Sequence, residues 1–152
     1  MASMPSKSQR PATYEDANLL LRLYELRREE KLRTARDWFA KNFHASTMEE
    51  VLKLCPLGSQ ENAYFRMVTS YWDMAASFVT SGVLHQEMFT QNSRELLFVW
   101  TRISDIVPAW REAFKNPDIA KNVETLASAM IEEEKRRGSY EAFRNMVRGI
   151  RP

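Results

Sequence analysis

Apolar residues recur at helical spacing along most of this 152-residue chain, and no stretch alternates in the manner of a β-strand. The pattern is clearest between Ser59 and Ser81, where polar residues occupy the opposite side of the helix. Ser59 is a suitable N-cap and Gly82 a suitable C-cap, so we predict a helix over this range. Its apolar face consists of Tyr64, Met67, Val68, Tyr71, Trp72, Ala75, Phe78 and Val79.

A second apolar face extends from about residue 94 to residue 114 and keeps its phase across Pro108. This proline lies on the polar side of the pattern, where a bend is best tolerated, so we predict one helix with a kink at Pro108. The alternative is a break at Val107, after which Pro108 opens a new helix. The face consists of Leu96, Val99, Trp100, Ile103, Ile106, Val107, Trp110 and Phe114.

The N-terminal part of the chain has no Gly or Pro between Tyr14 and Phe43, and Thr13 before it is a suitable N-cap. The sequence therefore predicts one long helix of about 30 residues. Its first stripe consists of Tyr14, Ala17, Leu21, Tyr24, Leu32, Ala35, Phe39 and Phe43. Leu19, Leu23 and Leu26 lie on the opposite side. Arg28 falls within the first stripe, so we expect it to pair with an acid, to turn out toward solvent or to bind an anion.

Shorter apolar patterns predict further helices after Thr47, near residues 86–89, after Pro117 and after Ser139. Four Gly and six Pro leave the chain with few turn residues. We therefore predict an all-α fold, a single-domain helical bundle of five to seven helices over residues 13–150. Residues 1–12 are rich in Ser, Pro and basic side chains, and we expect a disordered leader there.

The composition is that of a soluble globular protein, with 44% apolar and 28% charged residues. The net charge of +2 gives no strong long-range field toward DNA or an anionic membrane. Cys55 is the single cysteine, so the chain forms no internal disulfide. The sequence has no apolar run of membrane-spanning length, and its first residues lack the apolar region of a signal peptide. We therefore expect a cytoplasmic protein without membrane contact.

Motifs for catalysis or cofactor binding are missing from the sequence. Of its two histidines, His44 and His85, neither belongs to the Glu-x-x-His pair of di-iron bundles. No Gly-rich phosphate loop and no Gly-x-Ser-x-Gly motif occurs. Cys55, next to Pro56, fits a packing role. The sequence predicts a non-enzymatic protein with no catalytic residue, no cofactor and no metal ion.

The leading functional candidate is the second apolar side of the first helix. Leu19, Leu23 and Leu26 follow a 4–3 spacing, which produces a short apolar stripe. An exposed stripe of this kind marks a partner surface, and we expect a homodimer through it. The alternative is that the long helix lies between two layers of its own fold and buries both sides.

Two further functions remain open. Arginines are concentrated near the C-terminus together with aromatic residues, a combination that suits nucleic acid, although four nearby glutamates dilute the charge. The candidate contacts are Arg136, Arg137, Arg144 and Arg148. Alternatively, Trp72, Trp100 and Trp110 enclose a pocket for a small molecule.

Residues 61–114 resemble a bacterial all-helical family of unknown function. The resemblance rests on an aromatic helix with Tyr64-Phe65, Tyr71-Trp72 and Phe78-Val79, on the turn Ser81-Gly82-Val83-Leu84, on Glu87-Met88-Phe89 and on Leu97-Phe98-Val99-Trp100. It implies a helical fold and brings no catalytic residues. Some members of that family carry an N-terminal membrane anchor, and this chain departs from them in its polar leader.

Overall fold

The computed structural model describes residues 10–150, which form nine α-helices and no strand. The helices are α1 (Tyr14–Arg27), α2 (Glu30–Asn42), α3 (Met48–Leu54), α4 (Gln60–Thr80), α5 (Gln86–Asn92), α6 (Arg94–Ile103), α7 (Val107–Phe114), α8 (Lys121–Arg137) and α9 (Tyr140–Gly149). The all-α prediction is confirmed. The number of helices exceeds the predicted five to seven because both long predicted helices are divided.

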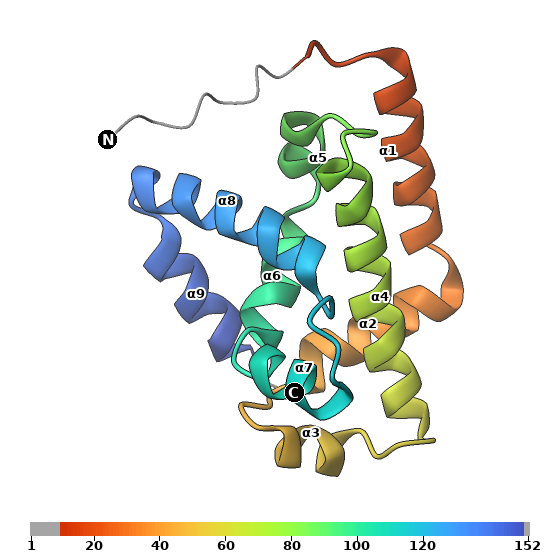
Figure 1. Ribbon diagram of the computed structural model, residues 1–152, viewed down its shortest axis with the longest axis vertical. Coiled ribbons are helices and arrows are strands. Elements are labelled where there is room, and N and C mark those ends of the chain that lie inside the picture. Colours follow the sequence, from red (N-terminus) through yellow and green to blue (C-terminus); the bar gives the residue numbers. More distant parts are fainter. Residues whose placement is uncertain (1–9, 151–152) are drawn as a thin grey trace.

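Helix α4 lies at the centre of the molecule, with α2 and α8 packed against it (Figure 1). Helix α6 lies against α8 and α9, and α1 stands at the outer edge beside α2 and α5. One hydrophobic cluster reaches from α1 to α8. Within it Phe43 stacks between Phe39 and Phe65, each ring centroid 5.0 Å away. The predicted apolar face of α4 is buried or half-buried in this cluster throughout.

The predicted long N-terminal helix is wrong, because the chain breaks between α1 and α2. Glu29 has an extended backbone, and its carboxylate accepts a hydrogen bond from the Leu32 N–H at 3.1 Å. The backbone N–H groups of Lys31 and Leu32 lower the pKa of Glu29, as expected for a carboxylate at a helix N-terminus. Arg28 turns out to solvent, with its guanidinium 5.4 Å from the centre of the Tyr24 ring.

This break resolves the two-sided pattern of the predicted helix. Leu32, Ala35 and Phe39 of α2 are buried, and so is Leu23 of α1. In one continuous helix Leu23 would have lain opposite the α2 residues. The change of direction at Arg28 lets both sets face the same core.

The predicted kink at Pro108 is also wrong, and the alternative describes the structure. Helix α6 ends at Ile103, and α7 begins at Val107 with Pro108 in its first turn. Proline is favoured there because the first backbone N–H groups of a helix have no partner within it. Ile103, Ile106 and Val107 are all buried, so the apolar face continues across the break.

Part of the predicted leader is held in the fold. Residues 1–9 lie outside the described residues, but Arg10 is described and forms an ion pair with Asp16. The two guanidinium nitrogens of Arg10 donate to the two carboxylate oxygens at 2.6 and 2.7 Å. Arg10 is therefore attached to the fold ahead of the first helix.

Candidate functional site

The structure gives the two sides of α1 the opposite roles to those predicted. Leu23 is 3% exposed, and Leu19 is half-buried against the core. Leu26, at the last turn, is the one member of the predicted stripe that is exposed. The predicted interface formed by Leu19, Leu23 and Leu26 is therefore corrected, because Leu23 packs in the core of its own chain.

The exposed apolar residues lie on the other side of α1. Tyr14 is 91% exposed, Leu21 is 59% exposed and Tyr24 is exposed as well. Together with the half-buried Ala17 they follow a 3–4–3 spacing, which places them on one face of the helix. We call Tyr14, Ala17, Leu21 and Tyr24 the outer stripe of α1.

Two tertiary contacts fix which side of α1 faces inward. The Asp16 carboxylate, 2% exposed, accepts a hydrogen bond from the backbone N–H of His85 at 2.9 Å. The hydroxyl of Tyr71 donates to the Leu23 carbonyl at 2.5 Å, and burial raises the pKa of Tyr71 to about 12. Both the N-terminal and the C-terminal half of α1 are thus tied to the α4–α5 region.

A pocket of about 260 Å³ lies beneath α1, between this helix and parts of α4 and α5. We call it the α1 pocket. It is lined by Leu20, Leu21, Leu23, Tyr24, Arg27, Tyr71, Trp72, Phe89, Asn92 and Ser93. Most of these side chains are apolar or aromatic, and Arg27 is the one charged residue among them.

Polar groups with unused hydrogen-bonding capacity lie in the wall of the α1 pocket. The indole N–H of Trp72 is buried and has no hydrogen-bond partner among the described residues. Ser93 is buried at the N-cap position of α6, yet its side chain does not cap that helix. The Arg27 guanidinium lies 5.0 Å from the Tyr24 ring centre and 5.6 Å from that of Trp72. Buried polar groups are normally paired, so the unpaired indole N–H of Trp72 is unusual.

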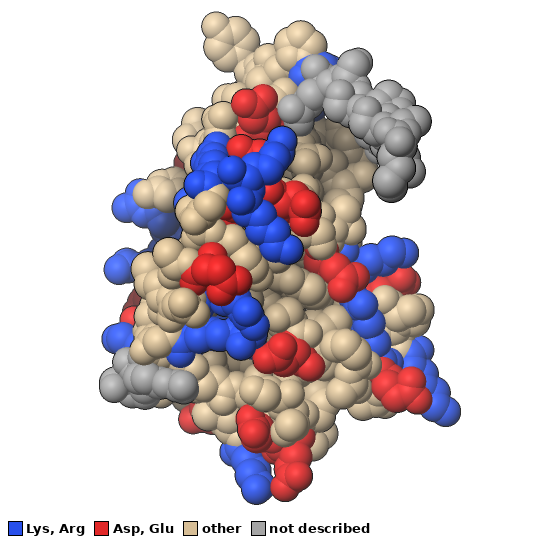
Figure 2. Space-filling view, turned by 90° about the vertical axis from the view of Figure 1, so that its left-hand side faces the viewer, with Lys and Arg blue, Asp and Glu red and all other residues tan. Residues whose placement is uncertain are grey.

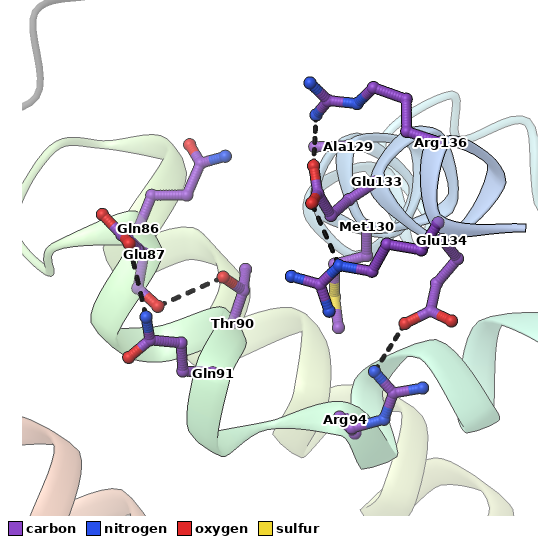
Figure 3. Close-up of a pocket in the computed structure, with 11 residues that line it drawn as sticks. Gln86, Glu87, Thr90, Gln91, Arg94, Ala129, Met130, Glu133, Glu134 and Arg136 are labelled. Atoms are coloured by element: carbon purple, nitrogen blue, oxygen red, sulfur yellow. Dashed lines mark hydrogen bonds and ion pairs between the residues drawn. The ribbon is translucent and has the colours of Figure 1, made fainter. Parts of the chain in front are cut away.

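A larger hollow of about 610 Å³ lies between α5 and α8, and we call it the α5–α8 cleft. Figure 3 shows Gln86, Glu87, Thr90 and Gln91 on one wall, and residues of α8 on the other. The arginines of this cleft already have acidic partners. Arg94 donates to Glu134 at 2.6 Å, and both Arg136 and Arg137 pair with Glu133.

Glu134 illustrates how fully this cleft is neutralised. It is 5% exposed and also accepts a hydrogen bond from the Ser139 hydroxyl at 2.5 Å. Arg94 first, and then Ser139, hold the pKa of Glu134 below its ordinary value. The carboxylate is therefore ionised and committed to Arg94, which leaves the cleft without a free positive centre at this point.

The four predicted nucleic-acid contacts do not form one basic surface. Arg136 and Arg137 pair with Glu133, Arg148 lies 3.7 Å from Asp105, and Arg144 is half-buried. Figure 2 shows acidic and basic side chains interspersed on the side of the molecule that bears α8 and α9. Neighbouring carboxylates reduce the potential that would attract a phosphate backbone.

Neither the α1 pocket nor the α5–α8 cleft is the predicted pocket among Trp72, Trp100 and Trp110. Trp72 lines the α1 pocket, but neither Trp100 nor Trp110 lines that pocket or the α5–α8 cleft. Trp110 instead packs on Phe65, with ring centroids 5.1 Å apart. Sequence reasoning missed Arg27 as the companion of Trp72, because the two residues are 45 positions apart and only the fold brings them together.

Comparison with protein families gives one match. The model of a family described as "Domain of unknown function (DUF4760)" matches residues 12–130. This confirms the predicted resemblance to a helical family of unknown function and extends it well beyond residues 61–114. No curated protein and no solved structure matches the chain significantly. The α1 pocket lies wholly within the matched range, whereas the four C-terminal arginines lie outside it.

The described residues contain neither a candidate membrane span nor a candidate metal site. No helix there is both long enough and apolar enough to cross a membrane. No group of three or more metal-ligating side chains occurs in residues 10–150.

Proposed function

We propose that this chain, which belongs to the DUF4760 family, is a non-enzymatic protein that acts through association, forming a weak homodimer through the outer stripe of α1. The observation that carries the proposal is the exposure of Tyr14, Leu21 and Tyr24 on one helix. Apolar residues grouped in this way on a folded surface mark contact sites. Helix α1 stands at the edge of the molecule, which leaves its exposed side accessible to a second copy (Figure 1).

The stripe is complementary to itself when two copies of α1 run antiparallel. With the two-fold axis at Leu21, this leucine faces its own copy, and the small Ala17 lies opposite the turn of the second copy that contains the large Tyr24. Tyr14 then faces Arg28 of the second copy, an arrangement that favours a cation–π contact. The antiparallel order also sets opposite ends of the two helix dipoles side by side.

The size of α1 limits the strength of this dimer. Fourteen residues make a helix of about 21 Å. A single pair of such helices buries less than the roughly 1,200 Å² of a standard stable interface. We therefore expect an association that depends on concentration, with a dissociation constant of about 10–500 μM.

Sedimentation velocity over that concentration range tests the proposal. The wild type should shift from monomer toward dimer, and Leu21→Glu should remain monomeric, because it brings two carboxylates together at the axis. Ala17→Glu, which lies outside the α1 pocket, should have the same effect. Leu52→Glu is the matched control, since Leu52 is an exposed leucine on α3, away from the stripe.

A wild type that stays monomeric throughout the range contradicts the proposal. So does a dimer that Leu21→Glu and Leu52→Glu weaken equally, because the contact would then lie elsewhere. Circular dichroism of each variant establishes that the helices are intact.

A further inference from the structure

Two side chains in the lining of the α1 pocket, Arg27 and Trp72, have polar groups that can only donate hydrogen bonds. An arginine guanidinium and an indole N–H are donors only, and the Ser93 hydroxyl is also able to donate. Trp72 is 1% exposed and its N–H is unpaired among the described residues. A bound group that accepts hydrogen bonds would pair with donors that have no partner among the described residues.

The charge of the α1 pocket points in the same direction. Arg27 forms no ion pair with a described carboxylate, whereas Arg94, Arg136 and Arg137 of the α5–α8 cleft all do. Glu95 of α6 forms an ion pair with Arg36 instead, at 2.9 Å. Arg36 also donates to the carbonyl of Arg27, which fixes the backbone at that position. The pocket therefore has one positive group held at its edge by two aromatic rings.

The volume and lining define the rest of the ligand. About 260 Å³ is slightly below the roughly 300–1,000 Å³ of pockets for drug-sized molecules. Leucine, tyrosine, tryptophan and phenylalanine side chains form most of the wall. Such a wall suits a small hydrocarbon or aromatic body and excludes a bare inorganic anion, which gains nothing from apolar contact.

From these features we infer that the α1 pocket binds a small amphipathic carboxylate, with its apolar body between α1 and α4 and its carboxylate at Arg27. The guanidinium binds the carboxylate through charge-assisted hydrogen bonds. Trp72 and Ser93 lie in the same wall and supply further donors. This site shares Leu21 and Tyr24 with the proposed dimer contact, but binding of the carboxylate at Arg27 does not require the dimer.

Titration with octanoate tests the inference, followed by tryptophan fluorescence and by isothermal calorimetry. Octanol and octylamine serve as uncharged and cationic probes with the same hydrocarbon chain. We expect saturable binding of octanoate and binding at least about tenfold weaker for the other two, the ratio that one charge-assisted hydrogen bond supports.

Substitutions then locate the carboxylate. Arg27→Gln should weaken octanoate at least about tenfold and leave octanol unchanged, while Arg27→Lys should keep most of the affinity because it keeps the charge. Arg22→Gln is the matched control, because Arg22 is an exposed arginine on the same helix that does not line the pocket. Ala17→Glu should bind octanoate as the wild type does, so that failure of the dimer and failure of this site are distinguished.

Three results overturn the inference. The first is no saturable binding of octanoate by a folded wild type. The second is equal affinity for the three probes, which would make the pocket apolar without preference for an anion. The third is an equal effect of Arg27→Gln and Arg22→Gln on octanoate binding, which would mean that Arg27 acts only through the overall positive charge of the surface.

Discussion

At the scale of single residues, Asp16 has more consequence than its place in a helix cap suggests. Its carboxylate accepts from Arg10, from the backbone and hydroxyl of Thr13, and from the backbone of His85. The guanidinium of Arg10 is the largest of the influences that hold the pKa of Asp16 far below its ordinary value. The position of Asp16 three residues after the predicted N-cap Thr13 is visible in the sequence, but its contact with His85, 69 positions away, follows only from the fold.

Substitution of Asp16 should make the stability of the fold depend less on pH in the acidic range. The pKa of Asp16 is lower in the folded than in the unfolded state, so ionised Asp16 stabilises the fold. This stabilisation is complete above the pKa of the unfolded state, near 3.8, and is lost as the pH falls below that value toward the pKa of the folded state. Asp16→Asn should therefore melt at a lower temperature than the wild type at pH 7, and the difference should shrink toward pH 3. Thermal melts followed by circular dichroism measure this. Glu15→Gln, an exposed neighbour, is the control, and a difference that stays constant with pH would contradict the assignment.

At the scale of helices, Arg102 connects three elements that the sequence does not relate. It is buried in α6 and donates to the Val147 carbonyl in α9 through Nε at 3.1 Å and Nη2 at 2.9 Å. Its Nη1 donates to the Phe43 carbonyl, at the end of α2, at 2.7 Å. A cation is favourable at helix C-termini because their last carbonyls are unpaired and carry partial negative charge. Sequence periodicity places Arg102 beside the apolar face of α6, with no sign that α9 covers it.

Removal of this side chain should loosen α9 before the rest of the molecule. Arg102→Met keeps much of the side-chain volume but leaves the two carbonyls without their donor, so the free energy of unfolding should fall by about 2–4 kcal/mol. Urea denaturation gives this value, and hydrogen exchange should show faster exchange in residues 140–149 than in α4. Arg22→Met is the exposed control. Unchanged protection of α9 would mean that its docking depends on Val147 packing instead.

At the scale of the whole molecule, the surface charges are balanced and interspersed. The net charge is +2, and three of the four predicted nucleic-acid arginines have a carboxylate nearby. The apolar surface is more concentrated, since α1 alone carries exposed Tyr14, Leu21, Tyr24 and Leu26. The distribution of surface groups therefore favours association with a protein over binding to a phosphate backbone.

This balance predicts weak and salt-sensitive contact with nucleic acid. Single-stranded oligonucleotides of about 20 residues, observed by fluorescence anisotropy, should show no retained binding at about 200 mM salt. A double Arg144→Gln, Arg148→Gln variant should behave as the wild type does. Binding that survives this salt concentration and is lost in the double variant would restore the C-terminal arginines as a functional site.

The sequence by itself determined which segments are helical, most of the residues that cap them and the apolar faces of α4 and α6, although not where the two longest segments are divided. These features depend on neighbours three or four positions apart, so a local pattern is enough to reveal them. The same local information indicated two apolar sides on α1, without deciding which of them faces the core.

Only the tertiary structure decided that question, together with the breaks after Arg27 and Ile103 and the existence of the α1 pocket. These helices end where a change of direction lets more apolar residues pack into the core, and the residues that form this core are far away in the chain. Tyr71 holds the Leu23 side inward, and the ring of Trp72 lies next to Arg27. Contacts of this kind join positions about 45 to 50 residues apart, a separation at which helical periodicity carries no information.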